Sequence, residues 1–152
     1  MSLKLGLISC TKSKVTYPCK ARELYSPSAL FTKALSYAER NYDLNGILSA
    51  KYGFILLDEP VEPYELTLKT MGEQEKKKWA NGVIRQLNEK IDLANFDSVF
   101  FHAGLEYRKN LVSFFRMRGM QIHVPLEGLS FGQQLEWYNR NLRVRGGIRT
   151  LF

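Results

Sequence analysis

The sequence contains no apolar run of about 18 residues, and this absence predicts that no helix crosses a membrane. It has only two cysteines, too few for a disulfide framework, and two histidines, and neither pair has the spacing of a metal site. The first residues, MSLKLGLISC, form a short apolar segment that leads into TKSK, which favours a first strand over a secretion signal. We therefore expect a cytoplasmic protein with reduced thiols, no bound metal and no cofactor.

Glycine-rich nucleotide motifs are missing as well. Neither the phosphate-binding pattern G-x-x-x-x-G-K-S/T nor the dinucleotide pattern G-x-G-x-x-G occurs. Their absence argues against an ordinary ATPase or a dinucleotide enzyme. A phosphate-bearing ligand would have to be held by cationic side chains and by the start of a helix near residues 26–28.

Positive charge is what the sequence has in excess, since its 152 residues carry a formal net charge of +7. The charge is concentrated near both ends, because residues 1–22 and 138–152 contain lysine and arginine and no acid. If the two segments lie on one face, they form a patch suited to phosphate or nucleic acid. The alternative is a basic surface that only keeps the protein in solution.

Strand and helix patterns alternate along the chain. Apolar runs with β-branched or aromatic content predict four strands, over residues 3–9, 46–50, 98–102 and 121–124. Residues 54–57 could add a fifth. Amphipathic patterns predict four helices, over residues 25–43, 72–91, 106–119 and 131–142, the first with Ser26 as its N-cap. We therefore expect a single α/β domain over residues 1–152, a Rossmann-like three-layer α/β/α sandwich with a mostly parallel sheet of four to five strands.

The segments that follow the predicted strands carry the clearest functional signal. In open α/β sheets, ligands bind at the carboxyl ends of the strands. The four strands are followed by CTKSK, KYG, AGLEYR and PLEGLSFGQQ, and each segment is expected to lead toward a helix. Such turns need glycine, serine and threonine in any case, but that need does not account for the cations. The cations Lys12, Lys14, Lys51 and Arg108 favour an anion site at the strand ends.

Cys10, Lys51 and Tyr52 are the candidates for catalysis. Cys10 follows the first strand with lysines two and four residues further on, and nearby cations stabilise a thiolate, the nucleophilic form of cysteine. His102, at the end of the third strand, could act as its base. A buried, inert cysteine and a hydrogen-bonded structural histidine are the alternatives.

Further residues are expected to bind the ligand. Cations near the strand ends would hold phosphate, tyrosines would hold a base or a sugar, and a glutamine could read a base edge. The ligand-binding candidates are Lys12, Lys14, Ser28, Ser49, Tyr64, Gly104, Tyr107, Arg108 and Gln133. Core packing is the competing explanation for each tyrosine. Asp58 and Glu62 could serve bond cleavage at a sugar, although loop acids are usually just solvated.

Four blocks of the sequence resemble a family of small uncharacterised bacterial and phage proteins. The blocks are CTKSK…PCKARELYSPSALF, ILSAKYGFILLDEPVEPYELTL, HAGLEYRKNL and PLEGLSFGQQLEW, and they span most of the chain. The second block, in which a strand leads into S-A-K-Y-G and then P-Y, is also similar over residues 48–66 to part of the YaaA-type peroxide-stress proteins. That resemblance implies a link to DNA or to the handling of DNA under stress, and it implies no particular reaction.

Two main hypotheses about function follow from these observations, and a third is a phage or stress interaction module whose strand-end motif only stabilises turns. The first is a domain that binds a phosphate-bearing nucleoside, nucleotide or nucleic-acid base at its strand ends, with transfer or hydrolysis at a glycosidic bond as the reaction considered. The second is a non-catalytic DNA- or RNA-binding protein that uses its basic termini, whose affinity would fall steeply with salt. Both make a nucleotide, nucleoside or nucleic acid the partner and exclude a membrane. The sequence leaves catalysis and the oligomeric state open.

Overall fold

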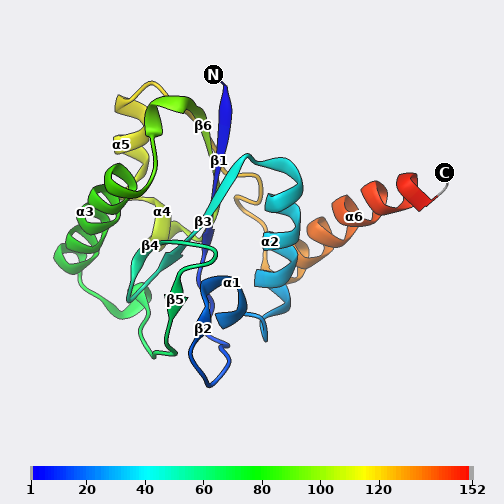
Figure 1. The fold of residues 1–152 in the computed structure, drawn as a ribbon, viewed down its shortest axis with the longest axis horizontal. Helices are drawn as coiled ribbons and strands as arrows, with labels where there is room; N and C mark the ends of the chain where they lie inside the picture. The colour runs from blue at the N-terminus through cyan, green and yellow to red at the C-terminus, as the bar shows by residue number, and fades with distance from the viewer. Residues whose placement is uncertain (1, 151–152) are drawn as a thin grey trace.

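Strand β1 (Leu3–Ser9) lies at the centre of a five-stranded sheet of order β4-β3-β1-β6-β7 (Figure 1). The computed structural model describes the backbone of residues 2–150 and the side chains of residues 2–143. The other strands of this sheet are β3 (Leu44–Ser49), β4 (Gly53–Leu56), β6 (Phe96–His102) and β7 (Gln121–His123). β1 pairs in parallel with β3 and β6, β6 pairs in parallel with β7, and β4 runs antiparallel to β3. The predicted mostly parallel sheet is confirmed.

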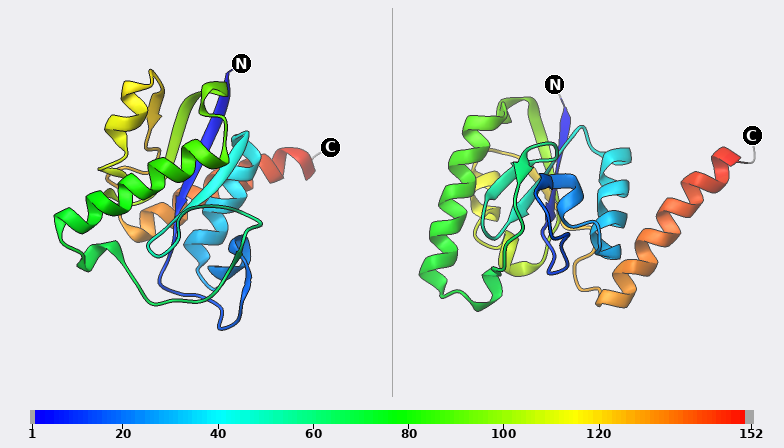
Figure 2. Two further views of the ribbon diagram at one scale, coloured as in Figure 1. Left: turned by 60° about the vertical axis from the view of Figure 1, so that its left-hand side comes forward. Right: turned by 60° about the horizontal axis from the view of Figure 1, so that its bottom comes forward.

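Helices cover both faces of this sheet, as Figure 2 shows. Alternate residues of β1 enter opposite cores: Leu5 and Leu7 pack on one side, and Ile8 packs on the other. The first core is completed by α3 (Glu73–Lys90), α4 (Leu105–Arg108) and α5 (Val112–Met117). The second is completed by α1 (Ala21–Leu24), α2 (Ala29–Asn41) and α6 (Phe131–Thr150). The predicted three-layer α/β/α architecture is therefore confirmed.

The stretch ILSAKYG forms a hairpin, and the expectation that it leads to a helix is wrong. β3 ends at Ser49, a short turn follows, and the chain returns as β4 from Gly53, which pairs with Ser49. Gly53 has a φ of 77°, a conformation that suits glycine at the end of a three-residue hairpin loop. Glycine at this position lets the chain reverse direction directly after β3. The residues after β3 therefore form a hairpin with β4, whereas the residues after β1 and β6 lead away from the sheet.

The predicted helices need three corrections. The first begins later than expected, because Ser28 and not Ser26 is the N-cap of α2, where its Oγ accepts a hydrogen bond from the Phe31 N–H at 3.1 Å. The helix predicted over residues 106–119 is two helices, α4 and α5. Between them the Leu111 N–H donates to the Arg108 carbonyl at 2.9 Å, three residues back, which interrupts the α-helical ladder. The last helix, α6, continues beyond the predicted end at residue 142, to Thr150.

Short elements fill the segments expected to be loops. β2 (Cys19–Lys20) and β5 (Pro60–Val61) form a separate antiparallel pair, so the long segment after β1 is held by a second small sheet. Short 3-10 helices form at η1 (Leu68–Thr70) and η2 (Leu93–Asn95). No helix in the described part of the chain combines the length and apolar character that crossing a membrane requires.

Candidate functional site

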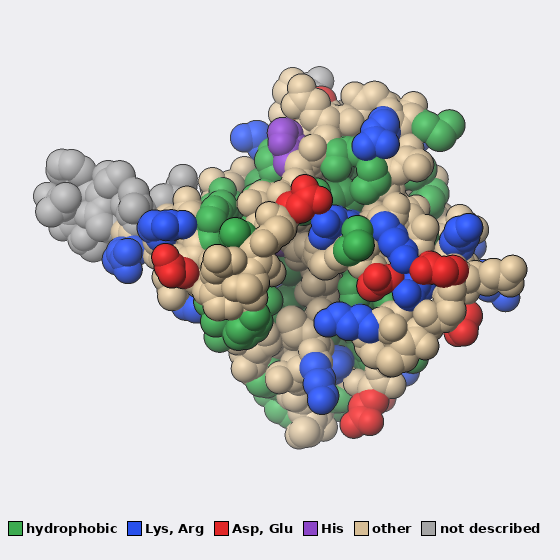
Figure 3. All heavy atoms as spheres, turned by 180° about the vertical axis from the view of Figure 1, so that it is seen from behind, with side chains coloured by type: hydrophobic (Ala, Val, Ile, Leu, Met, Phe, Trp, Pro, Cys, Tyr) green, Lys and Arg blue, Asp and Glu red, His purple; other side chains and the backbone are tan. Residues whose placement is uncertain are grey.

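A cleft of about 1110 Å³ lies at the carboxyl ends of β1, β6 and β7. Its walls include the residues that follow β1, the end of β6 with the start of α4, and the segment that leads into α6. Parallel neighbouring strands bring these exits to one edge of the sheet, the edge at which α/β proteins bind ligands. On the face shown in Figure 3, Lys and Arg side chains lie together with hydrophobic side chains around a hollow in the surface.

Of the residues that the structure describes, four cations line this cleft: Lys12, Lys14, Lys69 and Arg108. Arg108 is held in place, because its guanidinium donates to the Ala103 carbonyl at 2.8 Å and to the Glu127 carboxylate at 3.3 Å. The amine of Lys14 lies 4.5 Å from the centre of the Tyr64 ring. Desolvation lowers the pKa of Lys14, while the nearby Cys10 and Glu65 raise it. The cleft wall therefore combines one fixed guanidinium with three ammonium groups.

Cys10 and Tyr107 meet at the cleft. The Cys10 thiol donates to the Tyr107 hydroxyl at 3.6 Å, and the Leu68 N–H donates to the same oxygen at 3.3 Å. The backbone of Cys10 is fixed by its N–H, which donates to the Leu48 carbonyl at 2.9 Å. Burial is the main cause that raises the pKa of Tyr107 to about 12, so this hydroxyl stays neutral at physiological pH. Tyr107 thus joins the exit of β1 to the segment that contains η1.

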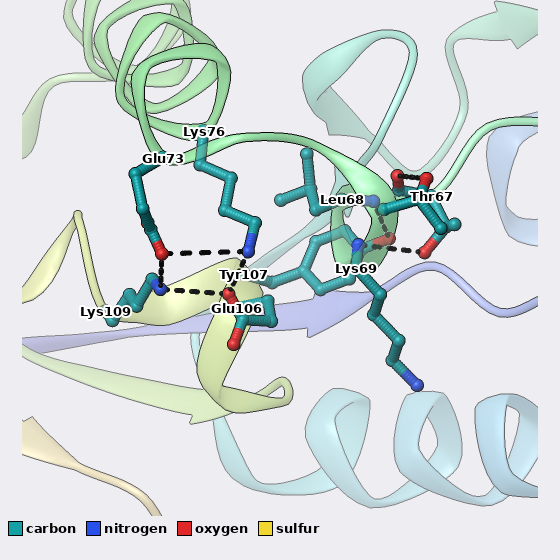
Figure 4. A network of polar contacts seen from close by, with 9 residues as sticks. Thr67, Leu68, Lys69, Glu73, Lys76, Glu106, Tyr107 and Lys109 are labelled. Carbon is teal, nitrogen blue, oxygen red and sulfur yellow. Dashed lines mark hydrogen bonds and ion pairs between the residues drawn. The ribbon is translucent and has the colours of Figure 1, made fainter.

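An ion-pair network supports the helix that carries Tyr107, as Figure 4 shows. Lys76 of α3, which is buried, pairs with Glu106 of α4 at 2.7 Å. Lys109 pairs with Glu73 at 2.8 Å and with Glu106 at 3.0 Å. The hydrogen bond from Lys76, followed by that from Lys109, lowers the pKa of Glu106. These pairs tie α4 to the start of α3 and so fix the position of Tyr107.

Ser49 and Tyr64 form a second polar cluster with Tyr25 that does not line the cleft. Ser49 Oγ donates to the Tyr64 hydroxyl at 2.9 Å, and the hydroxyls of Tyr64 and Tyr25 lie 2.8 Å apart. Ser49 and Tyr25 are fully buried, and desolvation raises the pKa of both tyrosines. Because its hydroxyls bond one another, this cluster stabilises the fold around the hairpin and the segment before η1.

Lys51 and Tyr52 lie on the hairpin and outside the cleft. The Tyr52 hydroxyl bonds the backbone of Glu62 twice, accepting from its N–H at 3.0 Å and donating to its carbonyl at 3.2 Å. The Tyr52 ring meets the Tyr64 ring edge-on at 5.7 Å, and the exposed Lys51 amine lies 5.3 Å from the Tyr52 ring centre. The structure therefore does not place these two residues with Cys10 at the cleft.

Ser28 and Gln133 cap helices. The side chain of Ser28 is occupied at the start of α2. Gln133 and Ser130 form a capping box at the start of α6: Gln133 Oε1 accepts from the Ser130 N–H at 2.9 Å, and Ser130 Oγ accepts from the Gln133 N–H at 3.3 Å. Gly104, in contrast, lines the cleft at the start of α4.

The acids Asp58 and Glu62 also lie outside the cleft. Asp58 pairs with Arg22 at 3.0 Å, and Arg22 also pairs with Glu39 at 3.1 Å. The basic segment at the start of the chain is therefore divided: Arg22 is neutralised by acids, while Lys12 and Lys14 line the cleft. At the other basic end, the side chains of Arg145 and Arg149 lie outside the described residues.

His102 lines the cleft but has both ring nitrogens occupied. Nε2 lies 2.6 Å from the Tyr42 hydroxyl and Nδ1 lies 2.6 Å from the Tyr138 hydroxyl. Desolvation lowers the pKa of His102 to about 4, so the ring is neutral at physiological pH. Through Tyr42 and Tyr138, this histidine connects β6 to the end of α2 and to α6. The described residues contain no group of three or more His, Cys, Asp and Glu side chains arranged to hold a metal ion.

Several cleft residues were missed by the sequence analysis. From the segment before and within η1 come Leu66, Thr67 and Lys69, and from α6 come Phe131, Gln134 and Tyr138. The pair QQ in the last block is a usable signal, but helical phase puts Gln134 and not Gln133 at the cleft. The segment around η1 does not follow a predicted strand, so the sequence alone offers no reason to place it at the site. In the folded chain it lines the cleft together with the residues at the end of β1.

Fold and site together define an α/β domain with a cationic cleft at the carboxyl ends of parallel strands. The chain belongs to the family of unknown function DUF6884, which it matches over residues 5–140. In fold it is similar to AF0587, a protein of unknown function, with 19% sequence identity and a TM-score of 0.55 over 93% of this chain and 44% of that one. The chain therefore spans less than half of that protein, and the likeness shows the fold alone. No curated protein matches the sequence.

Proposed function

We propose that the cleft binds a phosphate-bearing nucleoside, nucleotide or nucleic-acid base. The observation that carries this proposal is the gathering of Lys12, Lys14, Lys69 and Arg108 at the carboxyl ends of neighbouring parallel strands. Such cations hold phosphate without specifying the rest of the ligand. The acids Glu65 and Glu127 also line the cleft, and Glu127 is paired with Arg108, so the cations remain in excess.

The cleft also offers surfaces for the uncharged part of such a ligand. The buried Tyr107 supplies a neutral hydroxyl, and Phe131 supplies an exposed ring. Rings of this kind stack on bases. Gln134, whose amide nitrogen donates to the Leu129 carbonyl at 3.0 Å, leaves its carbonyl oxygen available as an acceptor for a base edge or a sugar hydroxyl.

A thermal-shift and calorimetric titration with nucleoside monophosphates, nucleosides and sulfate tests this binding. We expect nucleotides to raise the melting temperature more than nucleosides or sulfate do. Lys12→Ala and Arg108→Ala should each weaken nucleotide affinity about tenfold, since each removes a charge-assisted contact. Lys51→Ala is the matched control, because that lysine lies outside the cleft. Equal weakening by Lys51→Ala, or no nucleotide binding by the unmodified protein, contradicts the proposal.

For a reaction at this site we propose cleavage of the glycosidic bond, with Cys10 as nucleophile. Its thiolate would attack the sugar carbon, the base would leave with the bonding electrons and take a proton, and water would then hydrolyse the sugar–sulfur bond. Incubation with nucleotides, followed by chromatography for free base, tests this step. Base release that Cys10→Ser abolishes and Cys19→Ser preserves supports it, whereas release unaffected by Cys10→Ser rules out the nucleophile.

We also infer a relationship between the S-A-K-Y-G…P-Y block and the YaaA-type peroxide-stress proteins, and from it a role in stress or phage contexts that involve DNA. In this chain the block forms the β3–β4 hairpin and the segment that brings Tyr52 and Tyr64 into contact. Peroxide survival of cells that lack the protein, with and without the restored wild-type chain, tests the role. Equal survival of both contradicts it.

A further inference from the structure

Exposed hydrophobic side chains mark the mouth of the cleft. Leu66, Leu105 and Phe131 are 46%, 56% and 64% exposed, and each lines the cleft from a different segment. In contrast, Met117, which is 87% exposed, lies on α5 away from the cleft. These three side chains offer apolar contacts at the rim of the cleft to a ligand that extends beyond it.

Among the residues that the structure describes, two lysines on the same walls take part in no ion pair. Lys12 and Lys69 are exposed, and within the described residues no ion pair involves either amine. The arginine on the cleft wall differs, because Arg108 is already bonded to Ala103 and Glu127. Lys12 and Lys69 can therefore bind phosphates of a ligand that extends out of the cleft.

Helix α6 leads away from this mouth. It starts at the cleft with Phe131 and then projects outward from the body of the protein (Figures 1 and 2). Residues 131–150 contain four arginines and one glutamate. Arg143 is exposed, and Arg140 is 58% exposed beside that glutamate, Glu136. Over the described side chains, the cations of α6 begin at Arg140, nine residues and about 14 Å along the helix from Phe131 at the cleft.

We propose that the ligand of the cleft is an unpaired nucleotide within a single strand of nucleic acid, whose continuing strand passes Phe131 and the free lysines and follows α6. This inference rests on the proposed nucleotide site and extends it. Single strands present both phosphates and ring faces, which match the mixed cationic and apolar mouth. A duplex hides its bases in the stack and would have to expel one before it could enter.

Fluorescence anisotropy with labelled strands of increasing length tests the proposal. We use a mononucleotide, a 4-mer and a 12-mer, in single-stranded DNA and RNA arms, with a 12-base-pair duplex beside them. The affinity for the 12-mer should exceed that for the mononucleotide at least tenfold and should fall with rising salt. Tighter binding in one arm identifies the sugar that the site accepts. Equal affinity for mononucleotide and 12-mer, or tighter binding of the duplex, overturns the proposal.

Two sets of variants separate the strand path from the cleft. The double variant Arg140→Ala/Arg143→Ala should lower the affinity for the 12-mer at least fivefold, reduce its salt dependence and leave mononucleotide affinity unchanged. Arg116→Ala/Arg118→Ala, on the last turn of α5 and at its C-cap, is the matched control and should change neither. Phe131→Ala should lower 12-mer affinity about tenfold through lost stacking, whereas Met117→Ala should not. Loss of 12-mer affinity to the same extent in the α5 variants overturns the strand path.

The outcomes distinguish this inference from the proposal on which it rests. Mononucleotide binding that depends on Lys12 but gains nothing from strand length leaves the nucleotide site standing and removes the strand. If neither mononucleotide nor strand binds, both proposals are wrong. Polyglutamate is the competitor: displacement of the 12-mer by an equal charge concentration of polyglutamate shows a general polyanion surface and contradicts recognition of nucleic acid.

Discussion

β1 and β3 are adjacent parallel strands, but the polar side chains at their carboxyl ends have different roles. After β1, Lys12 and Cys10 face a cleft. At the end of β3, Ser49 bonds to Tyr64 from the segment after β5, and Tyr52 in the hairpin loop bonds to the backbone of Glu62. The antiparallel hairpin causes the difference, because it turns the chain back at the point where a parallel strand would continue toward a helix. Hydroxyls and cations after a strand therefore indicate a binding site only when the connection leaves that edge of the sheet open.

The largest effect should come from the hairpin turn itself. We expect Gly53→Ala to lower the free energy of unfolding by about 3 kcal/mol, since the left-handed backbone is strained for alanine and the Gln86 amide would have to leave its hydrogen bond with the Phe54 N–H. An added Cβ would lie 2.2 Å from Gln86 Oε1, the atom that accepts from the Phe54 N–H at 2.7 Å. Chemical denaturation measures the change.

Gly119→Ala is the control for the hairpin turn. Gly119 has a φ of 78° but no atom within 4 Å of its added Cβ, so only the backbone strain remains. We expect a loss of about 1 kcal/mol there. Equal losses at both glycines would show that the hairpin is not a specially packed unit.

Acid should lower the free energy of unfolding through His102, which lines the cleft. Its pKa is about 4 in the folded protein and about 6.5 when unfolded, so below pH 6.5 the unfolded chain binds a proton that the folded one does not. Stability is lost as pH falls from 6.5 toward 4, and the contribution between pH 7 and pH 5 is about 2 kcal/mol. Denaturation at pH 7 and pH 5 measures this pH dependence of stability. His102→Gln should remove it, and His123→Gln, the control, should retain it. An unchanged pH dependence in His102→Gln contradicts the assignment.

A smaller loss should follow removal of one hydroxyl from the buried cluster. Tyr64→Phe leaves Tyr25 and Ser49 without their shared partner and should cost about 1–2 kcal/mol. Nucleotide affinity should stay within twofold of wild type, because the cluster does not line the cleft. A loss of affinity with unchanged stability would move Tyr64 from a structural to a binding role. Denaturation and calorimetry on one preparation give both values.

The smallest effect should come from Lys51→Ala. Within the described part of the chain its exposed amine lies over the Tyr52 ring and forms no ion pair, so we expect stability to change by less than about 0.5 kcal/mol. Nucleotide affinity should not change. A tenfold loss of affinity in this variant would place the ligand on the hairpin. It would contradict the conclusion that the residues after β1 bind the ligand and those after β3 do not.

The sheet was predictable from the sequence because its strands are short apolar runs buried on both faces, and helix periodicity lies between them. β1 has the predicted bounds, Leu3–Ser9, and α3 follows its predicted pattern. Of the candidate site, Cys10, Lys12, Lys14, Gly104, Tyr107 and Arg108 come together at the cleft. Lys51 and Tyr52 do not, because strand-exit composition looks the same before a hairpin and before a helix. Lys69 and Phe131 reach the cleft through tertiary packing that no local pattern encodes.

A nucleotide titration followed by amide chemical shifts in two-dimensional NMR tests the comparison most directly. With a nucleoside monophosphate, we expect the amide signals of residues 10–14, 103–108 and 127–131 to shift with a common affinity, while those of residues 49–53 do not shift. Shifts confined to residues 49–53, with residues 10–14 unmoved, would contradict it.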